Sequence, residues 1–292
     1  MKKTSLIFCI SCFFVVTLSL FGLDNKLDYK VEEKEDIQKT LKFEDPSKPK
    51  EVLVDNIFGS ITAEGYNGKE VQLLVHKTIK ARTKDIIQRA KEEVELEITE
   101  DGNTIDLYVD GPFRCSNKGW RSRRWCNPGY EVHFDFELKV PHKTSLCLKT
   151  VTKGNIEVKN VEGEFQIKNV NGKIKMTEVA GAGEAHTVNG GVKVLFTKNP
   201  QADCSFHTIN GDIEISFREG LSADFRLKTF NGNAYSDFAM TYLPSRPAVS
   251  KRHEGKYIYK SDRFVGIRVK KGGPEIQMDT LNGDLLIAKR KK

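Results

Sequence analysis

Hydrophobic and polar residues alternate over much of this chain, and this pattern predicts β-strands with one buried and one solvated face. In the longest run, 132–140, every even-numbered residue is apolar, and Pro141 ends the pattern. Shorter runs precede it at 37–43, 51–55, 60–63, 70–76, 94–98 and 105–109. In one segment apolar residues instead recur at helical spacing after a candidate N-cap at Thr83. We therefore expect one short α-helix near residues 83–92 in a chain of strands.

Glycine recurs at a fixed interval after residue 150 and marks a repeating unit. Five glycines are spaced nine residues apart: Gly154, Gly163, Gly172, Gly181 and Gly190. The interval then lengthens to 21 residues, and the segments 201–211 and 222–232 align with one another. A short fixed period predicts one unit stacked on itself, because a single copy cannot bury its apolar face alone. The sequence therefore predicts an all-β fold, a single-domain β-solenoid.

The motif Thr-x-Asn-Gly marks the corners of this predicted solenoid. It occurs at 187–190, 208–211, 229–232 and 280–283, with the looser form Asn-Val-Asn-Gly at 169–172. Asn-Gly adopts positive φ at low cost, and stacked Thr and Asn side chains can hydrogen-bond the coils above and below. This structural role explains the motif without any ligand. The expected corner residues are Asn171, Gly172, Asn189, Gly190, Asn210, Gly211, Asn231, Gly232, Asn282 and Gly283.

A strand that ends at Val140-Pro141, followed by Thr-x-Asn-Gly coils such as the one that continues as 212–215, resembles the bacterial putative-adhesin β-solenoid family. The closing segments 271–276 and 282–285 are similar to the usual end of that family. The resemblance covers roughly residues 37–290. It implies a β-solenoid fold and a location at the cell envelope or surface. It implies no catalytic residues, because the family has no established set.

The N-terminus has the layout of an export signal. Two lysines precede an apolar stretch at 7–21, which predicts a signal peptide over residues 1–22 or, as the alternative, an uncleaved N-terminal anchor in the cytoplasmic membrane. The other expected segments are a charged linker at 23–36 and the solenoid domain at 37–292, with insertions at 110–130 and 238–265. The body is therefore expected to be exported, to the periplasm, the outer surface or the medium.

The charge of the chain is modest. The formal net charge is +7, and removal of residues 1–22 takes away two lysines and no acidic residue, which leaves +5. No nucleic-acid-binding motif is present, so nucleic acid is not an expected partner. Anionic envelope glycans, lipids or a host or surface ligand fit the charge as partners. Exposed solenoid ends can also pair edge to edge, so self-association is a further alternative.

The most distinctive candidate for ligand binding is the segment 113–126, which holds both tryptophans and four arginines. Arginine suits phosphate, sulfate or carboxylate, and tryptophan suits sugar rings or a membrane interface. The candidate ligand-binding residues are Arg114, Trp120, Arg121, Arg123, Arg124 and Trp125. A disulfide between Cys115 and Cys126 is expected in an oxidising compartment and would preorganise the loop. The alternative, compatible with binding, is a loop whose tryptophans cap an open end or flank of the solenoid.

Alignment of the repeats assigns positions to two further cysteines and two histidines. Cys204 falls in a core position and Cys147 in an outward one, so the two are not expected to pair. His186 and His207 share one outward position, which indicates a solvated column rather than a metal site. The equivalent positions elsewhere hold Lys149, Lys168, Lys228 and Asp279. The corners also lack the Gly-Gly-x-Gly-x-Asp sequence of calcium-binding β-rolls, and no metal or cofactor is expected.

Taken with the resemblance, these patterns predict a non-enzymatic exported protein of the envelope or surface, an adhesin-like binding or interaction module. The first alternative is a membrane-tethered envelope scaffold or signalling module. A polysaccharide-acting β-helix enzyme is the last alternative. It is disfavoured because the sequence contains no distinctive Ser/His/Asp or Cys/His set, and outward charges are what a solvated solenoid face requires.

Overall fold

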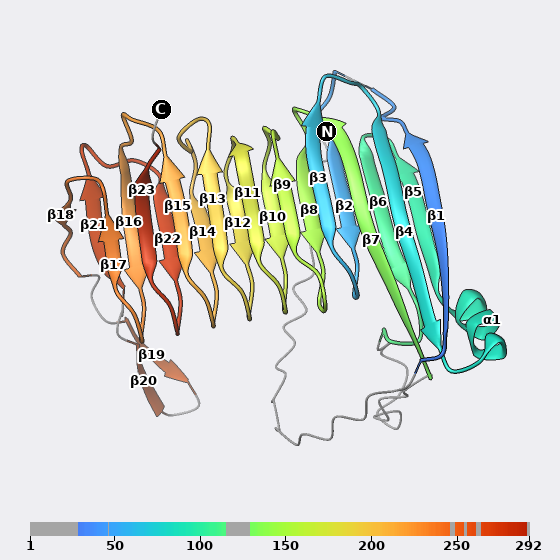
Figure 1. The fold of residues 1–292 in the computed structure, drawn as a ribbon. Helices are drawn as coiled ribbons and strands as arrows, with labels where there is room; N and C mark the ends of the chain where they lie inside the picture. Colours follow the sequence, from blue (N-terminus) through green and yellow to red (C-terminus); the bar gives the residue numbers. More distant parts are fainter. Residues whose placement is uncertain are drawn as a thin grey trace.

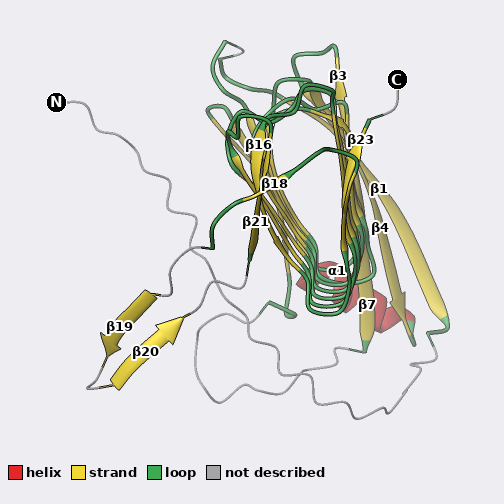
Figure 2. Cartoon of the chain, turned by 90° about the vertical axis from the view of Figure 1, so that its left-hand side faces the viewer, coloured by secondary structure: helices red, strands yellow, loops and turns green. Residues whose placement is uncertain are grey.

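The fold consists of two long β-sheets packed face to face. The computed structural model describes residues 29–45, 47–114, 129–245, 249–253, 256–260 and 264–290. Strands line up as successive rungs in the side view (Figure 1), and the view along the stack shows the two sheets joined by loops (Figure 2). The predicted all-β β-solenoid is thus confirmed. The signal peptide or anchor expected at 1–22 lies outside the described residues.

Sheet A has ten strands. In spatial order they are β1 (Val31–Leu41), β4 (Val71–Ala81), β7 (Tyr130–Pro141), β3 (Ile61–Tyr66), β9 (Ile156–Lys159), β11 (Ile174–Val179), β13 (Val192–Phe196), β15 (Ile213–Phe217), β23 (Leu285–Lys289) and β17 (Ala234–Ser236). Pairing is antiparallel between β1, β4 and β7, and parallel from β7 to β17. The sheet therefore joins an antiparallel end to a parallel solenoid.

Sheet B has eleven strands. In spatial order they are β18 (Thr241–Tyr242), β21 (Val265–Val269), β16 (Ala223–Lys228), β22 (Glu275–Asp279), β14 (Cys204–His207), β12 (Gly183–His186), β10 (Phe165–Lys168), β8 (Ser145–Lys149), β2 (Glu51–Asp55), β6 (Thr104–Asp110) and β5 (Glu95–Asp101). A separate hairpin consists of β19 (Val249–His253) and β20 (Lys256–Lys260). The hairpin and β18 both fall within the segment 238–265, which was expected to be an insertion.

Each coil is one strand of sheet B, a corner and one strand of sheet A. β8 continues into β9, β10 into β11, β12 into β13 and β14 into β15. The nine-residue glycine interval is therefore half a coil, because successive units alternate between the two sheets. Parallel register brings equivalent apolar residues together, as when Ile174 pairs with Ile156 on one side and with Val192 on the other.

The final coil in the sequence does not lie at the end of the stack. β22 pairs with β14 on one side and with β16 on the other, and β23 lies in the same way between β15 and β17. The last coil of the chain is thus inserted between two coils that precede it in the sequence. Every coil of a parallel stack presents the same backbone N–H and C=O groups to its neighbour. Backbone pairing therefore allows the last coil of the chain to lie between two earlier ones.

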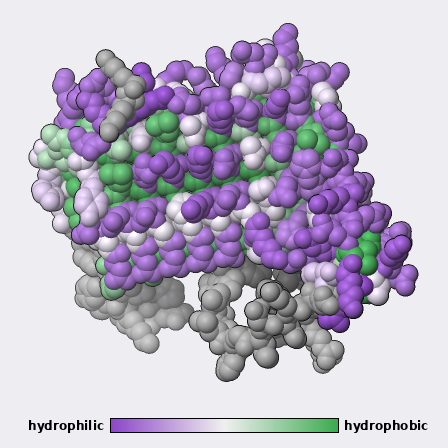
Figure 3. Space-filling view, in the orientation of Figure 1, coloured by the Kyte–Doolittle hydropathy of each residue, from purple (hydrophilic) through white to green (hydrophobic). Residues whose placement is uncertain are grey.

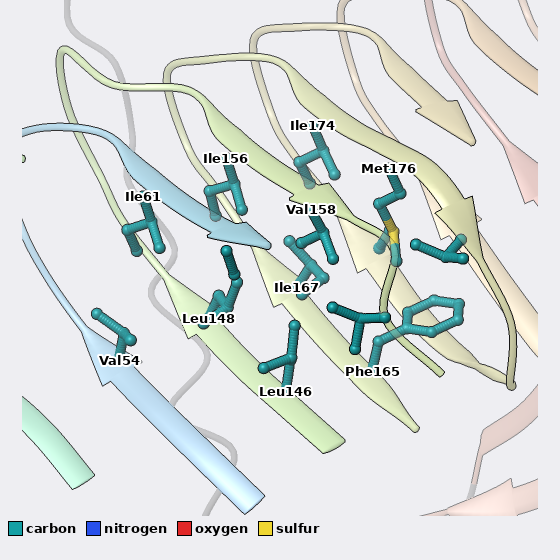
Figure 4. Packing of buried hydrophobic residues seen from close by; sticks show 14 of the residues in the cluster. Val54, Ile61, Leu146, Leu148, Ile156, Val158, Phe165, Ile167, Ile174 and Met176 are labelled. Atoms are coloured by element: carbon teal, nitrogen blue, oxygen red, sulfur yellow. The ribbon is translucent and has the colours of Figure 1, made fainter. Parts of the chain in front are cut away.

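The core lies between the two sheets and is apolar. Side chains such as Leu148, Ile156, Ile167 and Ile174 point toward one another from facing strands (Figure 4), and each is almost completely buried. A run of phenylalanines continues this core along the stack, with ring centroids 5.5–6.5 Å apart, and comprises Phe165, Phe196, Phe206, Phe217 and Phe225. Alternation along each strand is what directs one side chain in two into this interior.

The one helix in the described part of the chain, α1 (Lys84–Glu93), agrees with the prediction to within one residue. The Thr83 side chain caps it by accepting a hydrogen bond from the Ile86 backbone N–H at 3.4 Å. Ile87 and Ala90 are buried, since they form the face of the helix that turns toward the sheet. Among the described residues, no helix is long and apolar enough to cross a membrane.

β1 extends into the segment expected to be a charged linker. Val31 pairs with Ala81 and Leu41 with Val71, so the strand follows β4 over its whole length. Most of its charged side chains are exposed because β1 is an edge strand of sheet A, where charge discourages pairing with other chains. The linker prediction for 23–36 is therefore wrong from Val31 onward.

Candidate functional site

Threonines at the corners tie each coil to its neighbour. Thr208 is fully buried, and its hydroxyl donates to the Gly190 carbonyl of the adjacent coil at 2.8 Å. The same bond, at 2.8–3.0 Å, is made by Thr150, Thr187, Thr229 and Thr280. In the looser corner the Asn169 side chain replaces the hydroxyl and donates to the Gly154 carbonyl at 2.9 Å. At each of these corners a Thr or Asn side chain therefore supplies a hydrogen-bond donor to a backbone carbonyl of the adjacent coil.

Replacement of Thr208 by valine is expected to reduce the free energy of unfolding by about 1–3 kcal/mol. Valine preserves the shape but leaves the partly buried Gly190 carbonyl without the hydroxyl donor that now contacts it. Denaturant unfolding of the purified chain measures the change. The matched control is Thr241→Val, at an exposed position, which should leave stability nearly unchanged. Equal stability of both variants would contradict a stabilising role for the corner hydroxyl.

The corner asparagines form an exposed hydrogen-bonded ladder, which we term the asparagine ladder. A side-chain N–H of Asn189, Asn210, Asn282 and Asn231 donates in each case to the side-chain oxygen of the preceding asparagine in the ladder at 2.7 Å. In spatial order the ladder is Asn171, Asn189, Asn210, Asn282 and Asn231, and all five are exposed. Corner residues that are far apart in the sequence are thus brought into one line along the stack.

Most of the predicted binding loop lies outside the described residues, including Trp120, Arg121, Arg123, Arg124, Trp125 and the proposed Cys115–Cys126 disulfide. Its described base is firmly held. Phe113 packs edge-on against Phe58, with ring centroids 5.6 Å apart. Arg114 pairs with Asp55 at 2.9 Å, and its guanidinium lies 4.0 Å from the centre of the Tyr108 ring. Arg114 therefore has structural partners that fix where the loop leaves sheet B.

Four cationic or imidazole side chains form one line on the outer face of sheet B, which we term the basic row. Backbone register places Lys149, Lys168, His186 and His207 side by side on successive strands. Neither lysine forms an ion pair with another described residue. The two imidazole rings are 5.8 Å apart and nearly perpendicular. This arrangement agrees with the column that the repeat alignment predicted.

The basic row ends differently at its two sides. On one side Lys149 pairs in register with Asp55, the residue that holds Arg114 at the base of the loop. On the other side the Asp279 carboxylate accepts from Lys228 at 3.1 Å and lies 3.4 Å from the Nδ1 of His207. The basic row therefore begins beside the loop base and ends at Asp279, whose negative charge is balanced by Lys228. The alignment could not reveal the link to the loop, because it depends on the pairing of β2 with β8.

The environment of His186 disfavours its charged form at neutral pH. Burial lowers the pKa of the imidazole below its ordinary value, and the nearby His207 and Lys168 lower it further, whereas Glu184 acts in the opposite direction. Its Nε2 lies 3.3 Å from the Ser205 hydroxyl. Within the described ranges, no three His, Cys, Asp or Glu side chains are grouped so that they could hold a metal ion.

A parallel line of carboxylates, which we term the acidic row, lies on the same face of sheet B. It runs near the beginning of the strands and contains Glu51, Glu164, Asp203, Glu275 and Asp224. The pKa of the Glu51 carboxyl is raised, mainly by burial and further by the neighbouring Glu164 and Asp106. At its far end Asp224 is paired with Arg268 at 2.7 Å. Positive and negative charge are thus separated along the strand direction.

The outer face of sheet A has a different charge pattern. Lysines and glutamates on neighbouring strands pair there, as Lys193 does with Glu214 at 2.7 Å and Lys159 with Glu64 at 3.2 Å. Hydrophilic residues cover most of the surface seen in Figure 3 and form rows across the strands. Lys175 and Lys193 also lie side by side on this face, but each is paired with a glutamate, Lys175 with Glu157 and Lys193 with Glu214, so their charges are balanced there.

The two described cysteines, Cys147 and Cys204, are both buried. Cys204 lies in the core, as expected, and burial raises the pKa of its thiol to about 11. Cys147 is 6% exposed, so its side chain is covered even though the repeat alignment assigned it to an outward position. Its position in β8 does alternate outward, but Leu53 and Gln166 on the two adjacent strands flank it, and its Sγ lies 3.4 Å from the Gln166 side-chain oxygen.

Comparison with known proteins gives a family and several distant structures. Residues 142–256 match the family described as Toastrack DUF4097, which confirms over this segment the resemblance to a β-solenoid family of adhesin-like proteins. No curated protein matches the chain. A putative cell adhesion protein from Clostridium sporogenes is 11% identical, with a TM-score of 0.39, and the match covers 88% of this chain and 100% of that one.

Two further solved structures show a similar level of likeness. A putative adhesin from Bacteroides fragilis is 10% identical, with a TM-score of 0.38, over 89% of this chain and 98% of that one. A putative lipid binding protein from Parabacteroides distasonis is 13% identical, with a TM-score of 0.29, over 89% of this chain and 97% of that one. What these proteins bind is therefore not carried over to this chain.

Proposed function

Because residues 142–256 match the Toastrack DUF4097 family, we propose that this protein is a non-enzymatic, exported binding module of the cell envelope or surface that attaches to an anionic ligand. The observation that carries the proposal is the straight basic row on a rigid stack of coils. Backbone pairing fixes the spacing of its side chains, so little conformational entropy is lost when an extended ligand binds. An array of this kind suits attachment along a surface more than catalysis at one point.

The loop at 113–126 is the proposed point of strongest attachment. Its base is held by the Phe113–Phe58 contact and by the ion pair between Arg114 and Asp55, next to the first lysine of the basic row. Arginines and tryptophans in such a loop would add forked donors and flat apolar surface to the charges of the row. Loop and row would then act on one continuous ligand.

The proposed role of the loop is tested with the double substitution Trp120→Ala and Arg123→Ala. We expect binding to polygalacturonate, or to vesicles that contain an anionic phospholipid, to weaken at least about tenfold while the thermal unfolding temperature stays unchanged. Surface plasmon resonance on the exported chain gives the affinity. The matched control, Phe230→Ala with Arg218→Ala, removes an exposed aromatic residue and an exposed arginine elsewhere and should bind like the wild type.

Unchanged attachment of the loop variant would reject its role in binding. Equal weakening of the loop variant and the control would indicate non-specific attraction by surface charge. The export step is tested separately by cell fractionation with sequencing of the mature N-terminus. A new N-terminus near residue 23 in the periplasm or medium is the expected result, and retention of the full-length chain in the cytoplasmic membrane would favour the anchor.

A further inference from the structure

The two sheets do not end together at the end of the stack where β17 lies. The last coil there is β16, the corner 229–232 and β17, and sheet A stops at β17. Sheet B continues beyond β16 with two further strands, β21 and β18, which Figure 1 shows past the end of sheet A. We term β21 and β18 the overhang. We term the place beside β17 and opposite the overhang, which no described strand occupies, the step.

Exposed apolar side chains gather at this end of the protein. In the described part of the chain, the exposed large hydrophobic residues all lie on its last strands and corners, and they are Phe230, Tyr235, Tyr242, Val265 and Leu281. Pale and green atoms mark the same end in Figure 3. A group of exposed apolar side chains on an otherwise hydrophilic surface is typical of a protein–protein contact.

Two of these side chains belong to the inner face of the overhang. Val265 lies opposite Leu227, a core residue that is 4% exposed, so Val265 points to the inner side of sheet B. Tyr242 points to the same side because it pairs with Ile267, which packs against the core. Val265 is nevertheless 48% exposed and Tyr242 79% exposed. The overhang therefore has a core-like face that lacks a second layer within the described structure.

β17 presents a free backbone edge to the step. The Asn233 carbonyl accepts a hydrogen bond from the Leu285 N–H of β23 at 2.8 Å, so the backbone of Asn233 faces β23. Because successive residues of a strand face opposite sides, Ala234 and Ser236 direct their backbone N–H and C=O groups away from β23. None of the described strands lies on that side of β17. A free edge of this kind is a template for a further strand.

This end of the stack is almost uncharged, which suits contact with its own copy. Residues 229–245 contain one charged side chain, Asp237, although 30% of the whole chain is charged. The Asp237 carboxylate accepts a hydrogen bond from the Lys289 backbone N–H at 2.9 Å. A twofold contact brings each charge near its own counterpart, and like charges repel. The other edge of sheet A, β1, is rich in charged residues and is therefore a poor strand partner for β17.

We propose that two copies of the protein associate through this end, with the overhang of each copy filling the step of the other. A half turn about an axis parallel to the strands exchanges the two layers, so the overhang of the second copy comes to lie beside β17. Strand direction permits pairing there. β18 runs in the same direction as β16, since both are antiparallel to β21, and the corner 229–232 reverses the chain between β16 and β17. The second copy's β18 is then antiparallel to β17, and the two inner faces cover one another.

This arrangement has two consequences. It is closed, because each copy contributes its one uncharged end, so association stops at the dimer. Only a few strands of each copy take part, so we expect a weak dimer with a Kd of about 1–100 µM. Because the half turn exchanges the layers, the outer faces of the two B sheets, with their basic rows, point to opposite sides.

The test measures the mass of the whole exported chain, without any ligand, by sedimentation at concentrations up to about 200 µM. We expect a monomer–dimer equilibrium and no larger species. Val265→Lys places a charge beside its counterpart and should weaken the dimer at least about tenfold. The matched control is Leu281→Lys, because Leu281 is 46% exposed but lies at a corner outside the step. Its dimer should stay within about twofold of the wild type.

Two further measurements identify the contact itself. Ala234→Pro removes an N–H that has no strand partner in the monomer, so it should leave thermal unfolding nearly unchanged and weaken the dimer at least about tenfold. Val265→Glu alone should weaken the dimer as Val265→Lys does. An equimolar mixture of these two variants should dimerise within about threefold of the wild type, because opposite charges then meet across the twofold axis.

Several results would overturn the inference. They are a wild type that stays monomeric at the highest concentration, assemblies larger than a dimer, an equal loss for Leu281→Lys and Val265→Lys, and normal dimerisation of Ala234→Pro. Failure of the mixed Lys and Glu variants to associate would also contradict the twofold contact. None of these measurements involves the basic row or an anionic ligand, so each of them leaves the proposed function unaffected.

Discussion

Replacement of Gly172 by alanine is expected to lower the free energy of unfolding by about 3 kcal/mol or more. A Cβ atom added at Gly172 would lie 2.0 Å from the Gly154 carbonyl oxygen and 2.6 Å from the side-chain nitrogen of Asn169. The carbonyl belongs to the backbone of the neighbouring coil, so it cannot move unless the strand pairing also shifts. Chemical unfolding followed by circular dichroism measures the loss.

Gly220→Ala separates this collision from the general cost of substituting a glycine. Gly220 has φ +90°, but no atom lies within 4 Å of the position of its added Cβ. Only the backbone conformation is then strained, at a cost of about 1–2 kcal/mol. A clear excess for Gly172→Ala supports close stacking of the corners. Equal losses at the two sites would contradict it.

Truncation of Phe206 to alanine is expected to cost about 3–5 kcal/mol. Phe206 is completely buried between the sheets, and its ring centroid lies 6.3 Å from that of Phe165 and 6.5 Å from that of Phe196. Its removal leaves a cavity between coils that backbone hydrogen bonds hold at fixed spacing, so the walls cannot collapse into it. Thermal and denaturant unfolding should both detect the loss.

Phe230→Ala is the matched control for Phe206, because it removes the same side chain at a corner where it is 73% exposed. We expect its effect on stability to stay within about 0.5 kcal/mol. A comparable loss for the two variants would mean that the apolar interior does not hold the coils together.

The same stacking that stabilises the fold also creates the proposed binding surface. Pairing of β10 with β12 and of β12 with β14 aligns side chains of one kind, so a single substitution removes one member of a row and leaves the others in place. Loss of one cation should therefore weaken attachment gradually, whereas one overfilled corner disturbs every coil that rests on it. Stability and binding thus have different sensitivities to mutation.

The sequence by itself determined the local structure of this protein. Alternation predicted the strands, the Thr-x-Asn-Gly motif predicted the corners, and the spacing after Thr83 predicted the helix. Repeat alignment also placed His186 and His207 on neighbouring rungs. Each of these inferences depends either on residues that are close together in the sequence or on the interval at which a motif repeats. The amino-acid sequence alone shows both.

Only the tertiary structure decided how these units are ordered and which of them meet. It placed β22 between β14 and β16, extended sheet A with the charged β1, buried Cys147 on an outward position, and brought the loop base next to the basic row. Parallel strand edges expose identical backbone groups, so local sequence does not state which coil pairs with which. The order of the coils depends on how much apolar surface is buried and how many strands are paired between segments that are far apart in the sequence. A local sequence pattern carries no information about such long-range contacts.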